Sequence, residues 1–97
     1  MQKFIQYLES EKRSSPHTIV AYRSDLEEFE RFISVAYELS NLAEVSQPMV
    51  RSWLASLLDQ SRSVSTIHRK MASLQAYYRF LVKQGMIAVN PVKGISK

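Results

Sequence analysis

The sequence predicts an all-α protein built as a bundle of four helices. Glycine and proline are scarce, with two and three in 97 residues, and no run alternates polar with β-branched residues as a half-buried strand does. Apolar residues instead recur every three or four positions, which is the period of an amphipathic helix. We expect helices over about residues 2–12, 16–37, 47–59 and 64–84, with a C-terminal tail packed back on them.

The first two helices differ in length and in how they begin. Residues 2–12 carry three apolar side chains on one face, and so short a helix needs the rest of the domain for stability. Residues 16–37 follow Ser15, a good N-cap, and open with Pro16, whose missing N–H is tolerated at a first helical position. The polar side of this helix begins with hydroxyl and basic groups and continues with carboxylates. Only its first two turns therefore suit a polyanion.

The third helix is expected to start after Ser46, because Ser46 can cap it and Pro48 falls within its first turn. Trp53 lies in register with the leucines of this segment, so we interpret it as a core residue rather than a ligand platform. Two apolar residues of the preceding loop are expected to anchor it to the core: Leu42 and Val45.

The fourth helix has both ends marked. Ser63 or Ser65 can cap its start, and Gly85 can take the left-handed turn at its end. One face carries apolar residues at spacings of four, three, four and three: Ile67, Met71, Leu74, Tyr78 and Leu81. The opposite face is basic, with small residues between its arginines: Arg62, Thr66, Arg69, Ser73 and Ala76. Such a face can lie close against a flat, negatively charged partner.

Charge is divided unevenly along the chain. Residues 1–60 carry six Lys or Arg and nine Asp or Glu, a net of −3, whereas residues 61–97 carry seven basic residues and no acid. This asymmetry indicates a polyanion-facing half, and a solvated basic surface is the alternative. Two helix starts rich in hydroxyl and basic groups favour the first interpretation, since helix N-termini attract phosphate oxygens.

No motif indicates catalysis, a cofactor or a metal. The chain has no cysteine, no P-loop, no G-x-S-x-G, no glycine-rich dinucleotide turn and no H-E-x-x-H. Its two histidines, His17 and His68, are far apart and lack neighbours with metal-ligand spacing. We therefore expect no enzymatic activity, cofactor or metal. No stretch approaches the roughly 20 apolar residues that span a bilayer, so we expect a cytoplasmic protein without membrane contact.

Two stretches carry a family resemblance. The first is S-x-x-T-I-x-A-Y-R-x-D-L-x-x-F, from Ser15 to Phe29. The second is S-x-x-T-I-x-R-K-M-A-S-L-x-x-Y-Y-x-F-L, from Ser63 to Leu81, with Gly85 and an Asn-Pro pair downstream. Together they resemble the core-binding domain of tyrosine recombinases, most closely that of Xer-type recombinases and phage integrases. The resemblance covers nearly the whole chain, in order.

The resemblance implies a four-helix, SAM-like bundle that forms half of a C-shaped clamp around duplex DNA. The implied partners are double-stranded DNA, a catalytic domain of the same parent chain and other recombinase protomers. Neither H-T-I-V nor H-R-K-M contains the H-x-x-R of the family's active site, and none of the five tyrosines is expected to be its nucleophile. We thus expect residues 1–97 to be a single DNA-binding domain, with recombination or integration catalysed by a domain that this chain lacks.

The family's DNA-facing positions fall at the starts of the second and fourth helices. With neighbouring polar and basic residues, they give the expected DNA contacts: Thr18, Tyr22, Arg23, Arg62, Ser63, Thr66, His68, Arg69 and Lys70. We expect Arg69 to read a base and Lys70 to bind a phosphate. Tyr22 fits burial equally well, because it also lies on the apolar stripe of its helix.

A second interpretation is a helical protein-interaction module that docks an acidic partner through the basic face. Phe80 lies on that face by angle, so either a neighbouring helix covers it or it meets a partner subunit or the catalytic domain. In a docking module, Phe80 and Tyr77 would be the apolar anchors. A free-standing regulator made only of this domain is a third possibility.

Overall fold

The computed structural model describes residues 1–95, and they form the expected all-α bundle without a strand. Its elements are α1 (Gln2–Ser10), α2 (Pro16–Tyr37), the single 3-10 turn η1 (Leu42–Glu44), α3 (Gln47–Asp59) and α4 (Val64–Lys83). The predicted bounds of α2 and α3 are confirmed, whereas α1 and α4 end slightly earlier than expected. The last two residues of the predicted tail, Ser96 and Lys97, lie outside the described part.

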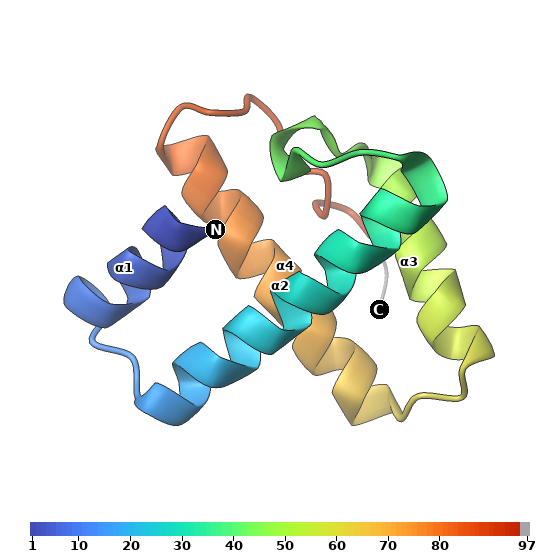
Figure 1. Ribbon diagram of the computed structural model, residues 1–97, viewed down its shortest axis with the longest axis horizontal. Coiled ribbons are helices and arrows are strands. Elements are labelled where there is room, and N and C mark those ends of the chain that lie inside the picture. The colour runs from blue at the N-terminus through green and yellow to red at the C-terminus, as the bar shows by residue number, and fades with distance from the viewer. Residues whose placement is uncertain (96–97) are drawn as a thin grey trace.

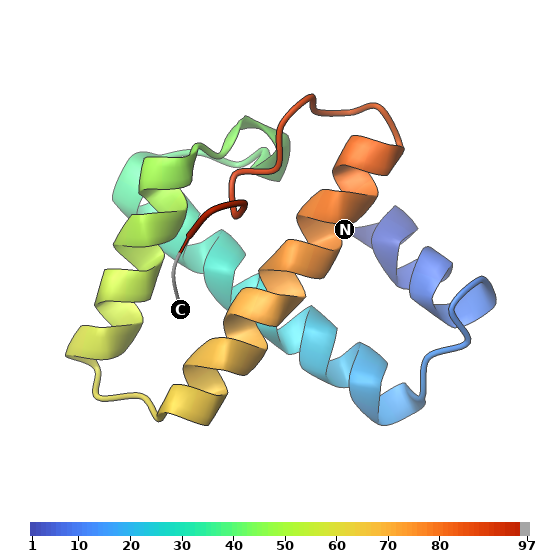
Figure 2. The ribbon, with the colours of Figure 1, turned by 180° about the vertical axis from the view of Figure 1, so that it is seen from behind.

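The two long helices, α2 and α4, cross each other and organise the molecule (Figure 1). On one side of the crossing, α1 fills the angle between the start of α2 and the end of α4. On the other side, α3 lies between the end of α2 and the start of α4, as the view from behind also shows (Figure 2). The starts of α2 and α4 therefore lie at the same end of the molecule, the lower edge of Figure 1.

The starts of α2 and α4 are built alike. Ser15 Oγ accepts the backbone N–H of Thr18 at 3.2 Å, and Ser63 Oγ accepts the backbone N–H of Thr66 at 3.2 Å. In both pairs the serine hydroxyl also donates to the threonine Oγ1 at 2.9 Å. The predicted caps of both helices are confirmed, and Ser63 rather than Ser65 caps α4.

Two other helix ends show what the sequence does and does not determine. Gly85 follows α4 with φ +75°, the left-handed geometry predicted for it. Ser46 takes the N-cap position of α3, but its side chain makes no capping hydrogen bond. Ser46 therefore begins α3 through its backbone conformation, and its hydroxyl group does not cap the helix as predicted.

The core lies around the crossing and beneath the shorter helices. Trp53 is 2% exposed and packs against Phe29 with 4.9 Å between ring centroids, which confirms Trp53 as a core residue. Leu42 and Val45 are buried, so the predicted loop anchors are confirmed. In the tail, Val92 is buried and returns the chain to the core. None of the helices described is long and apolar enough to cross a membrane.

Phe80 is covered by α1 and is only 7% exposed. Its ring centroid lies 5.0 Å from that of Tyr7 and 5.5 Å from that of Phe4. Phe4 also meets Tyr22 and Tyr77 edge-on, at 5.7 and 5.4 Å. Of the two predictions for Phe80, coverage by a neighbouring helix is confirmed, because the short α1 is docked through this aromatic cluster.

Candidate nucleic-acid interface

A cluster of ion pairs joins α2 to α4 where they cross. Lys70 Nζ lies 3.1 Å from Asp25 Oδ1 and 2.8 Å from Glu28 Oε1. Arg69 binds Asp25 through two hydrogen bonds, from Nε to Oδ2 at 3.2 Å and from Nη2 to Oδ1 at 2.7 Å. Ser73 donates to Asp25 Oδ2 at 2.7 Å. We call these residues, with Arg62, the crossing cluster.

Both carboxylates of the crossing cluster are held in the ionised form. Burial raises the pKa of Asp25, but hydrogen bonds from Arg69, Ser73 and Lys70 outweigh it and leave the pKa below its ordinary 3.8. Burial likewise raises the pKa of Glu28, and the charges and hydrogen bonds of Lys70 and Arg62 bring it below 4.5. Arg62 Nη1 lies 3.3 Å from Glu28 Oε2. Proton uptake therefore opposes the folded state here.

Burial removes Lys70 from the candidate interface. Its side chain is 2% exposed, and its ammonium group would have to leave Asp25 and Glu28 to reach a phosphate. The prediction that Lys70 binds phosphate conflicts with this geometry. Lys70 instead pairs with both carboxylates at the helix crossing, so its removal would leave Asp25 buried without one of its partners.

Arg69 combines internal support with exposure. Its side chain is 53% exposed, although Nε and one Nη2 proton are committed to the fully buried Asp25. A guanidinium group has five N–H donors, so the edge formed by Nη1 and the second Nη2 proton remains available. Such a pair of donors matches the O6 and N7 acceptors of guanine in a major groove.

The starts of α2 and α4 lie at equal distances along their helices from the point where the helices cross. Asp25 and Ser73, which are hydrogen bonded at the crossing, each lie ten residues after an N-cap serine. Ten residues of helix correspond to roughly 15 Å. The hydroxyl groups of Thr18 and Thr66 accept from their serines and keep their own protons for an outside acceptor. The paired starts can thus contact phosphates at two separate points.

A shallow groove of about 250 Å³ runs between the first turns of α2 and the middle of α4. It is lined by Thr18, Ala21, Tyr22, Arg69, Ala72 and Ser73. The fold thus brings three of the predicted site residues together in this α2–α4 groove: Thr18, Tyr22 and Arg69. Tyr22 is half-buried, as its place on the apolar stripe predicts, and its contact with DNA stays a prediction.

The other predicted site residues lie outside the groove. Arg23, Ser63 and His68 are exposed near the two helix starts, whereas Thr66 is half-buried. Arg62 is half-buried beside Glu28. These residues can contact a ligand that extends beyond the groove, but none of them shares its walls with Arg69.

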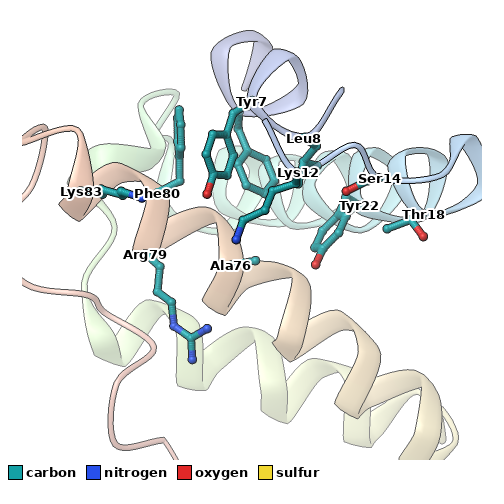
Figure 3. Close-up of a pocket in the computed structure, with 11 residues that line it drawn as sticks. Tyr7, Leu8, Lys12, Ser14, Thr18, Tyr22, Ala76, Arg79, Phe80 and Lys83 are labelled. Carbon is teal, nitrogen blue, oxygen red and sulfur yellow. The ribbon is translucent and has the colours of Figure 1, made fainter. Parts of the chain in front are cut away.

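A second, larger cavity was not predicted from the sequence. It encloses about 520 Å³ between α1, the start of α2 and the last turns of α4, and we call it the α1 pocket (Figure 3). Three cations line it: Lys12, Arg79 and Lys83. Arg79 and Lys83 lie on the same face of α4 as Arg69, and this part of the site could have been predicted from their spacing in the sequence. Nothing in the sequence places Lys12 beside them.

These features define a helical domain in which α2 and α4 begin alike and a groove with the half-exposed Arg69 lies beside their crossing. The sequence profile of the phage integrase N-terminal SAM-like domain matches residues 1–85, so the chain belongs to that family. The predicted resemblance to tyrosine recombinases of the Xer type is thereby confirmed.

Three curated relatives illustrate the similarity. Tyrosine recombinase XerC of Oceanobacillus iheyensis is 41% identical over 88 residues, which cover 91% of this chain and 28% of the relative. XerC of Halalkalibacterium halodurans is 38% identical over 100 residues, covering 97% and 33%. XerC of Listeria innocua is 36% identical over 95 residues, covering 98% and 31%. The chain spans about a third of the relatives' length. No solved structure matches it.

Proposed function

We propose that this domain binds double-stranded DNA as the N-terminal part of a tyrosine recombinase. The observation that carries the proposal is the placement of Arg69, half exposed in the α2–α4 groove and oriented by the buried Asp25. Its free edge points to a ligand with paired acceptors, which base edges provide. The relatives support the proposal, because a recombinase acts on DNA.

The helix starts would contact the phosphate backbone. Thr18 and Thr66 offer hydroxyl protons, and exposed Ser63 lies beside the start of α4. Because the serine cap uses the Thr66 N–H, the N–H groups of Val64 and Ser65 remain for a phosphate oxygen. Arg23, Arg62 and His68 add cationic or polar contacts. Phosphate contacts of this kind fix the orientation in which Arg69 meets the bases.

Strand exchange would be carried out elsewhere in the parent recombinase. The relatives named XerC extend over about three times the length of this chain, and we place the catalytic residues of recombination or integration in the part beyond it. Residues 1–97 would then act as one DNA-binding domain in the cytoplasm, alongside the catalytic domain and other protomers on the same DNA.

The interpretation as a protein-docking module lacks its anchors. Phe80 and Tyr77, the two aromatic residues expected at the centre of such an interface, are both buried beneath α1. Within residues 1–95, the aromatic side chains of the remaining basic surface, Tyr7 and Tyr22, are half-buried, which suits a polyanion better than a protein hot spot.

A titration of fluorescent duplexes selected from a random-sequence pool tests the proposal. Log K should fall linearly with log salt concentration, with a slope of about −0.9 for each phosphate neutralised. Arg69→Ala should weaken binding to the selected duplex more than to an unselected one, by about 1–3 kcal/mol. Absence of salt-dependent binding to every duplex would refute the proposed function.

A further inference from the structure

We propose that the α1 pocket is a second phosphate-binding site, which extends the DNA interface from the helix starts to the end of α1. The inference rests on the proposed DNA-binding function and adds a contact region that was not among the site residues predicted from the sequence. The pocket lies between α1, the first turns of α2 and the C-terminal half of α4 (Figure 3).

In the part of the chain that the structure describes, no ion pair compensates the charge of the α1 pocket. Lys12, Arg79 and Lys83 line it together with hydroxyl and aromatic groups, and no carboxylate is among the lining residues. Within residues 1–95, none of these three cations forms an ion pair. The crossing cluster differs, because Asp25 and Glu28 neutralise most of its positive charge. A polyanion is therefore attracted more strongly to the α1 pocket.

The backbone at Lys12 is held by the turn that ends α1. The backbone N–H of Lys12 donates to Tyr7 O at 3.2 Å, and that of Ser14 donates to Leu8 O at 2.9 Å. The side chain then extends over the pocket toward α4, and its Nζ lies 6.0 Å from the centroid of the Tyr7 ring (Figure 3). The ammonium group is thus held above an aromatic wall, with its donors open to a ligand.

The α1 pocket and the α2–α4 groove adjoin, since Thr18 and Tyr22 line both. One stripe of α4 follows the two cavities, at spacings of three, four, three and four: Arg69, Ala72, Ala76, Arg79 and Lys83. Fourteen residues of helix extend about 21 Å. The two alanines keep the middle of the stripe low, so a DNA backbone that leaves the groove at Arg69 can continue to Lys12 and Lys83.

Because the α1 pocket adjoins the α2–α4 groove, the phosphate that it binds is expected to belong to the bound duplex. A free phosphate would need only a small closed site, whereas this pocket is open to the groove along Thr18 and Tyr22. Ser14 and Thr18 add hydroxyl donors at the rim, a combination typical of contacts that position a protein on DNA without reading sequence.

Two sets of charge-removing variants distinguish the contribution of the α1 pocket to DNA binding from the effect of a lower net charge. The test triple is Lys12→Gln, Arg79→Gln and Lys83→Gln. The matched control triple is Arg31→Gln, Arg51→Gln and Lys93→Gln, three exposed cations that line neither the pocket nor the groove. Fluorescence anisotropy with a duplex of about 30 base pairs would be measured over a salt series, and circular dichroism would confirm that each variant is folded.

The test triple should reduce the magnitude of the salt slope by about 2–3 units, and the control triple by less than one. Equal slopes for the two triples overturn the inference while leaving DNA binding intact. Failure of the unmodified domain to bind any duplex refutes the proposed function itself.

A second arm distinguishes the source of the phosphate. Inorganic phosphate is titrated while the amide signals of Lys12 and Ser14 are followed by NMR. Small shifts at high concentration, with a flattened DNA slope in the test triple, support DNA as the ligand. Saturable shifts that the test triple abolishes, with an unchanged DNA slope, would assign the pocket to a free anion and overturn the DNA assignment.

Discussion

Lys70 Nζ lies 3.1 Å from Asp25 Oδ1, and both side chains are withdrawn from water where α2 crosses α4. A buried ion pair does not stabilise a fold by attraction alone, because desolvation of the two charges opposes it. Here Asp25 also accepts from Arg69 and Ser73, and no buried side-chain polar atom of residues 1–95 lacks a partner. Because all these partners lie between α2 and α4, we expect the pair to favour the contact of these two helix faces over others.

Replacement of Lys70 by methionine should destabilise the domain without changing its DNA contacts. The variant leaves Asp25 buried with Arg69 and Ser73 alone, so we expect a loss of about 2–3 kcal/mol in the free energy of unfolding. Urea denaturation measures it, with Lys93→Met as an exposed control. The salt slope of DNA binding should stay unchanged in the folded variant; a slope flattened by about one unit would return Lys70 to the interface.

Acid should weaken the fold through Asp25 and Glu28. Both have pKa values below their ordinary 3.8 and 4.5, so at moderately acid pH the unfolded chain binds protons that the folded chain excludes. The contribution of these two carboxylates to the free energy of unfolding should thus be fully present above about pH 4.5. It should be lost as the pH drops through their folded-state pKa values. Asp25→Asn should flatten this dependence in urea titrations repeated across pH. An equally steep fall in the variant would locate the effect elsewhere.

The sequence predicted the helices well because its local signals and its packing agree. Ser15, Pro16, Ser63 and Gly85 mark helix ends by chemistry that acts within a few residues, and the structure uses each of them. The spacing of apolar residues predicted the core residues correctly, including Trp53, for the same reason.

The charge of Lys70 predicts a phosphate contact, but its register on α4 predicts burial, and the structure follows the register. Lys70 lies three residues after Ile67 and four before Leu74, so its position faces the core. Only its pairing with Asp25, 45 residues earlier, makes a cation acceptable there. The α1 pocket was missed for a related reason: Lys12 reaches α4 only through the tertiary docking of α1, which no local pattern encodes.

Removal of the N-cap side chain should lower the free energy of unfolding measurably at α4 and hardly at all at α3. Ser63→Ala removes the acceptor of the Thr66 N–H, and we expect a loss of about 1 kcal/mol in the free energy of unfolding. Ser46 makes no such hydrogen bond, so Ser46→Ala should cost a few tenths of a kcal/mol at most. Thermal and urea unfolding of the two variants compare them directly. Equal losses would contradict the assigned caps.

Truncation of Phe80 should release α1 from the bundle. The ring fills the space between Phe4 and Tyr7, and large-to-small changes of buried aromatic residues cost about 3–5 kcal/mol. Phe80→Ala should therefore speed hydrogen exchange in α1 first. Phe80→Leu, which retains most of the volume, serves as the milder control. If exchange in α1 stays as slow as in the unmodified domain, α1 is held by contacts other than this aromatic cluster.

Arg69 can be tested for its two roles by a pair of substitutions. Arg69→Lys keeps the charge, but one ammonium group cannot bind both oxygens of Asp25 and also present two parallel donors to a base. Arg69→Gln removes the charge as well. Both should lose about 1–3 kcal/mol of preference for a selected duplex over an unselected one, whereas only Arg69→Gln should also flatten the salt slope. Full sequence preference in Arg69→Lys would show that Arg69 contributes charge without reading bases.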